Sequence, residues 1–450
     1  MAANRGLLRP NATLSAGDHH RWAIDTVAQV QVGGRQCLTD SRSKSNGPFG
    51  RYVMEVFMNR IRGMSRRGFV GGAATALGYL GLKPGADLWA ESLPVRRSSF
   101  DQQTYDYDSF AKLSSNENPY GPTDKMWEAM DMAKKYSMRY GYPDGDIQEK
   151  IAEHHGVEPE NILLGAGSGE VLRTMGLTYM GAHKKVVGVE PSYSTVYRHA
   201  TGLKGDAILL PLNEDYTQNI PAMIHATMQN RRDLGFVYLC NPNNPTGVIV
   251  TQNEVRQLLD GIPEDMPTLI DEAYHHFVED PRYATAIPYV KEGRRVVIAR
   301  TFSKIYGMAA LRIGYAVAPA DMIQEMRNYA TGSVNVLARW GAAAALDDPD
   351  AEKQVFDITL RLRKQTAAAL RNLGYDVIPS ETNFIMVHTG RPVQEVQQAF
   401  REKGVLVGRP FPPMLDHLRV SIGTEEEMDR FLTAWKELFP AKTAADTASG

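Results

Sequence analysis

The chain has 450 residues and is 43% hydrophobic, which is enough for one large or two medium globular domains. Its formal net charge of −2 gives no whole-chain attraction to nucleic acid or to an acidic membrane surface. Two cysteines, Cys37 and Cys240, imply no disulfide framework. The histidine pairs at 19–20, 154–155 and 275–276 lack a carboxylate-rich ligand spacing, so we expect no metal site.

The first ninety residues are predicted to lie outside the globular fold. Residues 1–63 have no sustained periodicity, so we expect a disordered tail or an extension before a true start at Met64. Over residues 64–90, Arg66 and Arg67 precede an apolar run too short to remain in a bilayer as a spanning helix. This segment is similar to a twin-arginine export signal, with cleavage expected just after residue 90. The alternative is a basic patch before a buried helix in a cytoplasmic protein.

Residues 155–335 alternate short apolar runs with helical periodicity. Strands are predicted at 162–164, 186–189, 207–212, 236–240, 268–270, 296–299 and 311–317, and helices at 171–180, 192–203, 220–230 and 252–259. Apolar runs this short, separated by helices, indicate a parallel sheet that is covered on both faces. We therefore predict an α/β fold, with residues 155–335 as its large, cofactor-binding domain.

The remainder has a different pattern, which predicts a smaller α+β domain over residues 336–440. Helices are predicted at 322–329, 336–345, 351–373, 393–403 and 425–439, and strands at 384–387 and 418–422. The long helix at 351–373 is a plausible link between the two domains. Residues 91–154 are expected to form an N-terminal arm and part of the small domain, and 441–450 a frayed tail.

Lys304 is the first candidate catalytic residue, because it follows the apolar run at 295–300. A lysine between buried strands is desolvated, and the resulting lower pKa suits it to condense with an aldehyde and to act as general base and acid. Thr301, Ser303 and Arg312 could donate to a phosphate, Arg312 with a full charge. Arg312 taken alone could equally belong to a surface ion pair.

Polar side chains follow two other predicted strands. Asp271 ends the run at 268–270, at the edge where ligands bind in open α/β sheets, and could pair with a protonated pyridine nitrogen. A helix N-cap would explain Asp271 equally well. Asn244 and Tyr274 could both hydrogen-bond to a phenolic oxygen on the same ring. The alternatives are a simple Asn-Pro-Thr-Gly turn and a tyrosine at the edge of the core.

Five further candidates would surround such a ring. Gly167 and Ser168 lie where a predicted strand leads into a helix, and backbone N–H groups at a helix N-terminus suit a phosphate. Tyr193 could stack on the ring or simply pack in the core. Arg419 is a charge in an apolar strand, which favours a substrate carboxylate or phosphate as its partner unless it faces outward. Arg409 is a weaker candidate for the same role.

An amide, a carboxylate, a lysine and an arginine in this order are the components of a pyridoxal phosphate site. The chain resembles the fold-type I pyridoxal phosphate aminotransferases, and within them the histidinol-phosphate aminotransferase branch, over about residues 110–437. The motifs that carry the resemblance are Ser115–Pro122, Tyr142–Asp144, Gly165–Ser168, Asn241–Gly247, Asp271–Tyr274, Thr301–Lys304 with Arg312, Glu381–Phe384 and Leu418–Val420.

The resemblance implies a mostly parallel seven-stranded sheet, pyridoxal 5'-phosphate as cofactor, and transfer of an amino group to a 2-oxo acid. The expected donor is an amino acid or an amino-alcohol phosphate of the histidinol-phosphate kind. The resemblance also implies a homodimer in which Tyr142 reaches the partner's cofactor phosphate. Arg419 would then hold the acidic group of the substrate, and Tyr120 would lie near the substrate entrance.

Two features separate this chain from the histidinol-phosphate branch. Members of that branch usually carry a Pro-Tyr pair in the N-terminal arm, which the segment 100–105 lacks. Export would also be unusual for an enzyme of histidine synthesis. An aromatic or other amino acid is therefore an alternative donor, and a pyridoxal phosphate decarboxylase or lyase is an alternative enzyme on the same scaffold.

Overall fold

The computed structural model describes residues 107–441, except 182 and 203–204. The predicted extension, the predicted export signal and nearly all of the predicted tail lie outside the described residues. Within the part that is described, no helix is both long enough and apolar enough to cross a membrane.

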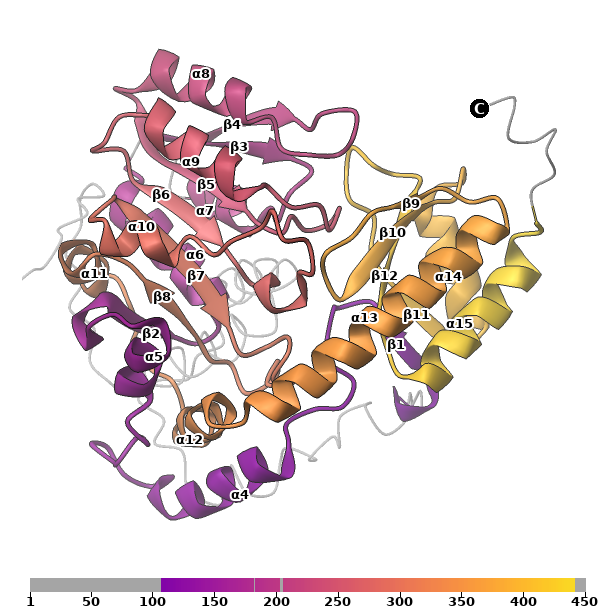
Figure 1. Cartoon of the computed structure of the whole chain (residues 1–450), viewed down its shortest axis with the longest axis horizontal. Coiled ribbons are helices and arrows are strands. Elements are labelled where there is room, and N and C mark those ends of the chain that lie inside the picture. Colours follow the sequence, from indigo (N-terminus) through magenta and orange to yellow (C-terminus); the bar gives the residue numbers. More distant parts are fainter. Residues whose placement is uncertain (1–106, 182, 203–204, 442–450) are drawn as a thin grey trace, which may run out of the picture. The chain divides into compact units, whose positions relative to one another are not determined.

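A seven-stranded sheet forms the centre of the larger part of this fold (Figure 1). Its strands are β2 (Ile162–Gly165), β3 (Lys185–Glu190), β4 (Asp206–Pro211), β5 (Leu234–Cys240), β6 (Thr268–Asp271), β7 (Val296–Thr301) and β8 (Gly314–Val317). They lie in the order β2-β8-β7-β6-β5-β3-β4. Strand β8 runs antiparallel to both of its neighbours, and the other neighbouring pairs are parallel. The predicted mostly parallel α/β sheet is confirmed.

Helices cover both faces of this sheet. Neighbouring residues on a strand point to opposite faces, so apolar side chains on both faces need to be covered. The helices are α4 (Asp124–Ala133), α5 (Ile147–His155), α6 (Ser168–Tyr179), α7 (Thr195–Gly202), α8 (Ile220–Asn230), α9 (Gln252–Gly261), α10 (Ile287–Lys291), α11 (Ala320–Arg327) and α12 (Val336–Leu346). Val186 packs with α6, α7 and α11, whereas Val187 packs with the cluster that includes α5, α8, α9, α10 and α12. Strands β5, β6 and β7 are therefore buried on both faces, whereas every residue of the edge strand β4 keeps some exposure.

The terminal part has its own strands, helices and core. Its elements are β1 (Ala111–Leu113), β9 (Val377–Ile378), β10 (Phe384–His388), β11 (Val405–Val407), β12 (His417–Ser421), α13 (Pro349–Asn372), α14 (Val393–Glu402) and α15 (Glu425–Leu438). Strand β10 pairs antiparallel with β12 and β9, and β1 pairs parallel with β11. Phe400, Phe431 and Trp435 are fully buried in the core between these sheets and helices. The predicted α+β character of this part is confirmed.

Helix α13 links the two parts of the fold, as predicted (Figure 1). Its early residues Val355 and Phe356 pack against the core of the seven-stranded sheet, while Leu362 and Leu370 belong to the terminal core. The short 3₁₀ helices are η2 (Tyr107–Ser109), η3 (Lys134–Tyr136), η4 (Pro159–Asn161) and η5 (His275–Phe277). Helices α4, α5 and α12 pack with the core of the seven-stranded sheet, and β1 packs with the core of the terminal part. The predicted domain boundaries stay a prediction.

Local sequence signals fix several helix starts. Thr251 accepts the backbone N–H of Glu254, and the Glu254 carboxylate accepts the N–H of Thr251, which together form a capping box at α9. Thr424 and Glu427 repeat this arrangement at α15.

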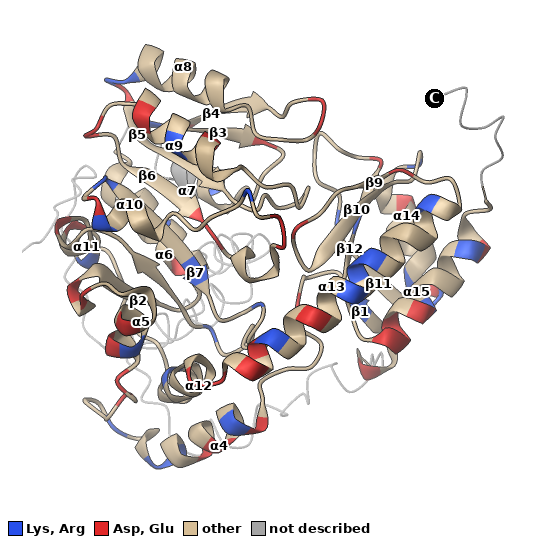
Figure 2. Cartoon of the chain, viewed as in Figure 1, with Lys and Arg blue, Asp and Glu red and all other residues tan. Residues whose placement is uncertain are grey.

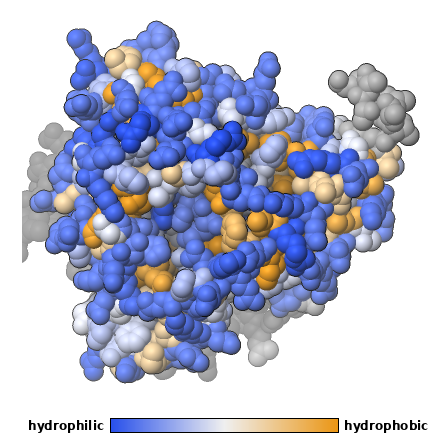
Figure 3. All heavy atoms as spheres, viewed as in Figure 1, coloured by the Kyte–Doolittle hydropathy of each residue, from blue (hydrophilic) through white to orange (hydrophobic). Residues whose placement is uncertain are grey.

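Figure 2 shows that most charged residues lie on helices and loops, and the face in Figure 3 is mostly hydrophilic with scattered apolar patches.

Two predicted positions are wrong in detail. Arg312 was expected near the start of a strand, but β8 begins only at Gly314. Arg312 has φ 58°, which is outside the extended conformation, so the chain turns there before the ladder with β7 can begin. Tyr193 was expected to begin a helix, yet it precedes α7. The Ser192 hydroxyl donates to Oδ1 of Asn243 at 2.8 Å, which holds this segment outside the helix.

Candidate active site

A cavity of about 290 Å³ lies beside the carboxyl ends of the parallel strands, where ligands bind in open α/β sheets. Eleven of the predicted site residues line it: Ser168, Tyr193, Asn244, Asp271, Tyr274, Thr301, Ser303, Lys304, Arg312, Arg409 and Arg419. They come from both parts of the fold. The sequence prediction thus selected residues that the fold brings to one cavity, and the individual role of each stays a prediction.

Lys304 lies in the loop after β7 and is half-buried. Its Nζ donates to the backbone carbonyls of Ser115 and Asn116 at 3.1 and 3.0 Å, and no carboxylate pairs with it within the described residues. Burial, together with the positive charges of Arg419 and Arg312, lowers the pKa of Lys304 to about 8. A substantial fraction of this amine is therefore neutral near physiological pH, as condensation with an aldehyde requires.

Asp271 is the last residue of β6 and is 3% exposed. Its Oδ1 accepts the backbone N–H of Ala273 at 3.2 Å, and its Oδ2 accepts the hydroxyl of Tyr238 at 3.4 Å. Burial raises the pKa of Asp271 to about 6, and these two donors oppose that rise. The carboxylate has no cationic hydrogen-bond partner among the described residues, so a protonated ring nitrogen in the cavity would complete its charge pairing.

The hydroxyl of Tyr274 is held by two amides. Asn116 Nδ2 donates to it at 3.0 Å and Asn244 Nδ2 at 3.3 Å. Because the hydroxyl accepts both bonds, its own proton remains to be donated to an oxygen in the cavity. Asn244 and Tyr274 were both predicted to reach a phenolic oxygen, and the structure places them side by side.

A cradle for an anion lies at the N-terminus of α6. Ser168 and neighbouring Gly169 line the cavity there, and Ser303 and Arg312 approach from the loop after β7. Arg312 donates to Ser303 Oγ at 3.4 Å and otherwise to the carbonyls of Ala309 and Ala166 at 2.7 and 3.2 Å, so its charge has no carboxylate partner there.

Gly167 does not line the cavity, but it shapes this cradle. It has φ 82°, in the region that favours glycine, and a Cβ there would collide with the guanidinium of Arg312. A larger residue at position 167 would therefore displace the charge from the N-terminus of α6. The prediction of Gly167 as a direct cofactor contact stays a prediction.

Two arginines from the terminal part complete the cavity. Arg419 on β12 is 7% exposed; it donates to Oδ1 of Asn244 at 2.7 Å and to the carbonyl of Ser114 at 2.8 Å. Its Nε has no hydrogen-bond partner among the described residues. The guanidinium groups of Arg409 and Arg419 lie 4.3 and 4.6 Å from the ring centroid of Phe411. Arg419 is thus a buried cation that still lacks an anion.

Tyr142 and Tyr120 lie outside this cavity. The Tyr142 hydroxyl donates to the carbonyl of Val334 at 3.0 Å, and the guanidinium of Arg339 lies 5.8 Å from its ring centroid. Tyr120 is 45% exposed. The expected contact of Tyr142 with a partner's cofactor phosphate and the expected position of Tyr120 near the substrate entrance stay predictions.

Three residues that line or support the cavity contact predicted site residues, although they were not themselves predicted as site residues. Asn116, which is 1% exposed, joins the Tyr274 hydroxyl to the Ser421 side chain and to Lys304. Phe411 lines the cavity beneath the two arginines, and Tyr238 contacts Asp271 from the core. The Asn-Glu-Asn-Pro motif could have singled out Asn116. The other two contacts depend on loop and strand register, which no local pattern reveals.

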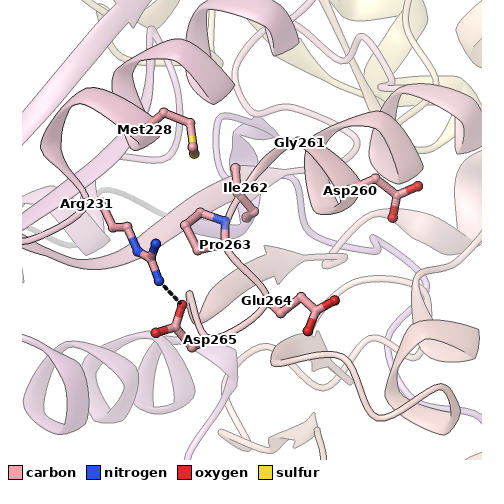
Figure 4. A pocket seen from close by; sticks show the side chains of 8 residues that line it. All are labelled: Met228, Arg231, Asp260, Gly261, Ile262, Pro263, Glu264 and Asp265. Atoms are coloured by element: carbon pink, nitrogen blue, oxygen red, sulfur yellow. Dashed lines mark hydrogen bonds and ion pairs between the residues drawn. The ribbon is translucent and has the colours of Figure 1, made fainter.

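A second hollow of about 530 Å³ lies at the end of α9 and shares no residue with the site cavity (Figure 4). It is lined by Met228, Arg231 and residues 260–265. Asp265 pairs with Arg231 at 3.3 Å, with both side chains more than half exposed. A solvated ion pair of this kind is a feature of the surface and gives no reason to assign chemistry to this hollow.

The residues around the site cavity fit pyridoxal phosphate. The anion cradle at α6 suits its phosphate, the buried carboxylate of Asp271 its ring nitrogen, the hydroxyl of Tyr274 its phenolic oxygen, and Lys304 its aldehyde. When bound, this cofactor supplies an electron sink that stabilises the carbanion formed at the substrate's α-carbon.

The chain's own groups supply proton transfer and orientation. Lys304 Nζ, with its lowered pKa, can accept the proton from the substrate carbon and return it as an acid. Arg419 is predicted to hold an acidic group of the substrate, which would fix the substrate bond that faces the base.

Comparison with known proteins agrees with this site. Residues 108–434 match the family model described as aminotransferase class I and II. A histidinol-phosphate aminotransferase from Symbiobacterium thermophilum is 36% identical over 332 residues, which covers 72% of this chain and 89% of that protein. A second histidinol-phosphate aminotransferase, from Methylococcus capsulatus, is 36% identical over 335 residues, which covers 72% of this chain and 88% of that protein.

Solved structures show the same relationship. The histidinol-phosphate aminotransferase from Sinorhizobium meliloti in complex with pyridoxal-5'-phosphate matches with a TM-score of 0.69 and 25% identity, covering 77% of this chain and 98% of that one. L-threonine-O-3-phosphate decarboxylase from Porphyromonas gingivalis shares the fold, with a TM-score of 0.63 and 22% identity over 73% of this chain and 98% of that one. The chain therefore belongs to the class I and II aminotransferase family and is a pyridoxal phosphate-dependent transaminase.

Proposed function

We propose that the amino donor carries an acidic group, with histidinol phosphate as the best candidate, and that a 2-oxo acid accepts the amino group. The observation that carries this proposal is Arg419, a buried guanidinium in the cavity wall whose Nε is unpaired within the described residues. Removing such a cation from water costs free energy unless an anion pairs with it. The names of the similar aminotransferases support histidinol phosphate as that anion's source.

A comparison of histidinol phosphate with histidinol tests this proposal, because the two donors differ only in the phosphate. In the wild-type protein, formation of pyridoxamine phosphate should be far faster with histidinol phosphate. Arg419→Lys keeps a charge but removes the planar fork, so it should lower kcat/KM for histidinol phosphate about thirtyfold and for histidinol much less.

Arg391→Lys is the matched control for the charge and the size of the change. The Arg391 guanidinium lies over the Phe439 ring in the terminal core and does not line the cavity. This variant should behave like wild type with both donors. An unchanged preference for histidinol phosphate in Arg419→Lys would contradict the proposed phosphate contact.

An aromatic amino acid is the second candidate donor. Phe411 and Tyr193 line the cavity near Arg419, and together they could accept an aromatic side chain while Arg419 holds the α-carboxylate. The absence of a Pro-Tyr pair at 100–105, which lies outside the described residues, favours the same alternative. A donor screen that includes phenylalanine, tyrosine and acidic amino acids distinguishes the two candidates.

A homodimer with shared sites is the proposed assembly. Trp127, Met138 and Tyr140 are 49%, 77% and 104% exposed, and they follow one another along α4 and the segment that leads to Tyr142. Neighbouring exposed apolar side chains favour a protein interface. Mixing inactive Lys304→Ala chains with Tyr142→Ala chains should restore activity in the mixed dimer, where one site carries neither change. A monomeric protein, or no recovery, would contradict this assembly.

Export by the twin-arginine route is proposed from the pattern at residues 64–90, which lies outside the described residues. Substitution of both Arg66 and Arg67 by lysine keeps the charge but removes the paired guanidinium groups. The protein should then stay in the cytoplasm, as measured by fractionation of cells that express the full chain. Continued export of this variant would reject the signal.

A further inference from the structure

Tyr238 contacts Asp271 from within an apolar core on one face of the seven-stranded sheet. Its side chain is fully buried in the core beneath α6, α7 and α11, and it does not line the site cavity. Its hydroxyl donates to Oδ2 of Asp271 at 3.4 Å. A polar group therefore reaches out of an apolar core to the carboxylate that faces the cofactor's ring nitrogen.

Strand register explains this contact. Cys240 on β5 lies directly opposite Asp271 on β6 in the parallel ladder. Tyr238 is two residues earlier on β5, so its side chain points to the same face of the sheet as that of Cys240. A tyrosine is long enough to span this diagonal, whereas a shorter side chain at position 238 would leave Oδ2 without its donor.

The charge state of both groups supports the contact. Burial raises the pKa of Tyr238 well above its ordinary value, so its hydroxyl stays protonated and can only donate to a carboxylate. Burial raises the pKa of Asp271 as well, and the donated bonds from Tyr238 and Ala273 counteract that rise.

The other titratable groups around Asp271 do not replace Tyr238. Cys240 faces it from β5, Glu272 adjoins it on β6, and Lys304 and Tyr274 approach from the loops after β7 and β6. The Cys240 thiol donates instead to the carbonyl of Pro242 at 3.4 Å. Glu272 carries like charge, which disfavours ionisation of Asp271.

We propose that Tyr238 is a positioning residue, which fixes the Asp271 carboxylate and favours its ionised form, so that Asp271 can hold the protonated ring nitrogen of pyridoxal phosphate. This inference concerns the cofactor and holds whichever donor the enzyme uses. Tyr238 touches neither substrate nor cofactor and acts only through Asp271.

Tyr238→Phe removes the hydroxyl and keeps the ring. Loss of one hydrogen bond to an ionised group raises a pKa by about one unit. Cofactor binding requires ionised Asp271, so the dissociation constant of pyridoxal phosphate should rise several-fold at pH 6 and about tenfold at pH 5. It should match wild type at pH 9, where Asp271 is ionised in both proteins. Equilibrium titration of the apoprotein, followed by the absorbance of the bound cofactor, measures these ratios.

Tyr197→Phe is the matched control. Tyr197 is also buried, and its ring centroid lies 5.6 Å from that of Tyr238. Its hydroxyl donates to the carbonyl of Val189 rather than to Asp271. This variant also removes one tyrosine hydroxyl from the same core. The ratio of its dissociation constant for pyridoxal phosphate to that of wild type should not change with pH. An equal ratio at every pH for Tyr238→Phe, or the same pH dependence in Tyr197→Phe, would overturn the proposal.

A double-mutant cycle protects the test from a general loss of stability. In an Asp271→Asn protein, position 271 no longer ionises, so adding Tyr238→Phe should no longer change cofactor affinity in a pH-dependent way. If the pH-dependent effect of Tyr238→Phe persists without the carboxylate, Tyr238 does not act through Asp271. Thermal unfolding of each apoprotein establishes that the variants are folded at the temperature of the titration.

Discussion

Asp271 and Glu272 are consecutive carboxylates, both almost fully buried, yet their surroundings differ completely. Glu272 accepts hydrogen bonds from Arg300 at 2.6 and 3.1 Å, from the Thr285 hydroxyl at 2.8 Å and from the Ala286 amide at 2.7 Å. Within the described residues, the side chain of Asp271 accepts only two hydrogen bonds, both longer and both from uncharged groups. The carboxylate with a full set of partners is structural, and the one that lacks a cationic partner faces the cavity.

The cations differ in the same way. Arg300 pairs with a buried carboxylate, while Arg419 and Lys304 bond to uncharged oxygens, chiefly backbone carbonyls. Burying charges without internal partners costs stability, and a fold can retain them where a ligand completes the pairing. Incomplete pairing, rather than charge or burial alone, therefore distinguishes the candidate active site from the structural core of this protein.

The largest effect is expected at Lys304. Lys304→Ala removes the amine that we predict to move the proton, so the rate of pyridoxamine phosphate formation should fall roughly a thousandfold or more. The free energy of unfolding should change little, because no carboxylate in the described part of the chain pairs with this lysine. Stopped-flow absorbance measures the first effect and urea unfolding the second. Lys353→Ala, an exposed control, should leave both unchanged; a Lys304→Ala protein with an unchanged rate would exclude the mechanism.

Glu272→Gln should show the opposite pattern. It leaves Arg300 buried without its counter-ion, so the free energy of unfolding should fall by about 3–5 kcal/mol. Asp271→Asn, one residue away, should lower stability much less but weaken cofactor binding strongly. Chemical denaturation of the two apoproteins and cofactor titration measure this contrast. Equal losses of stability would refute the distinction between the two carboxylates.

A smaller effect on stability is expected from His155, the last residue of α5. The His155 Nε2 lies 2.8 Å from the Tyr315 hydroxyl, and burial, with the positive charge of Arg300, lowers the pKa of His155 to about 2. The unfolded chain then binds more protons than the folded one below about pH 6.5, so stability is lost as the pH falls, by about 1.4 kcal/mol per pH unit for one group.

His155→Gln should reduce the pH dependence of the unfolding free energy between pH 6 and pH 5 by this amount. Urea unfolding at several pH values provides the measurement. His225→Gln, which changes an exposed histidine on α8, should leave the slope as it is in wild type. The same slope in His155→Gln would show that this buried imidazole does not resist protonation.

Much of the fold and of the site could be predicted from the sequence. Apolar runs such as 236–240 and 296–299 are local signals, and each predicted strand overlaps an observed one. The residues that line the cavity could be singled out because Asp271 and Asn244 each follow a strand and Lys304 follows another. The carboxyl ends of parallel strands meet at one edge of the sheet.

The features that were not predicted depend on contacts distant in sequence. Strand β1 has three residues and pairs with β11 almost 300 positions later, so no local period marks it. The turn at Arg312 reflects its positive φ, and Tyr238 reaches Asp271 only through the register of β5 and β6. Side-chain partners across strands follow from tertiary structure and not from local propensity.

The most direct test of the central claim is chemical trapping of the bound cofactor. The holoenzyme is reduced with borohydride and digested, and the peptide that carries the cofactor is sequenced by mass spectrometry. We expect a single modified peptide with the cofactor fixed on Lys304. Attachment to a different lysine, or a protein that binds pyridoxal phosphate without a reducible bond to Lys304, would contradict the assignment of this cavity as the catalytic centre.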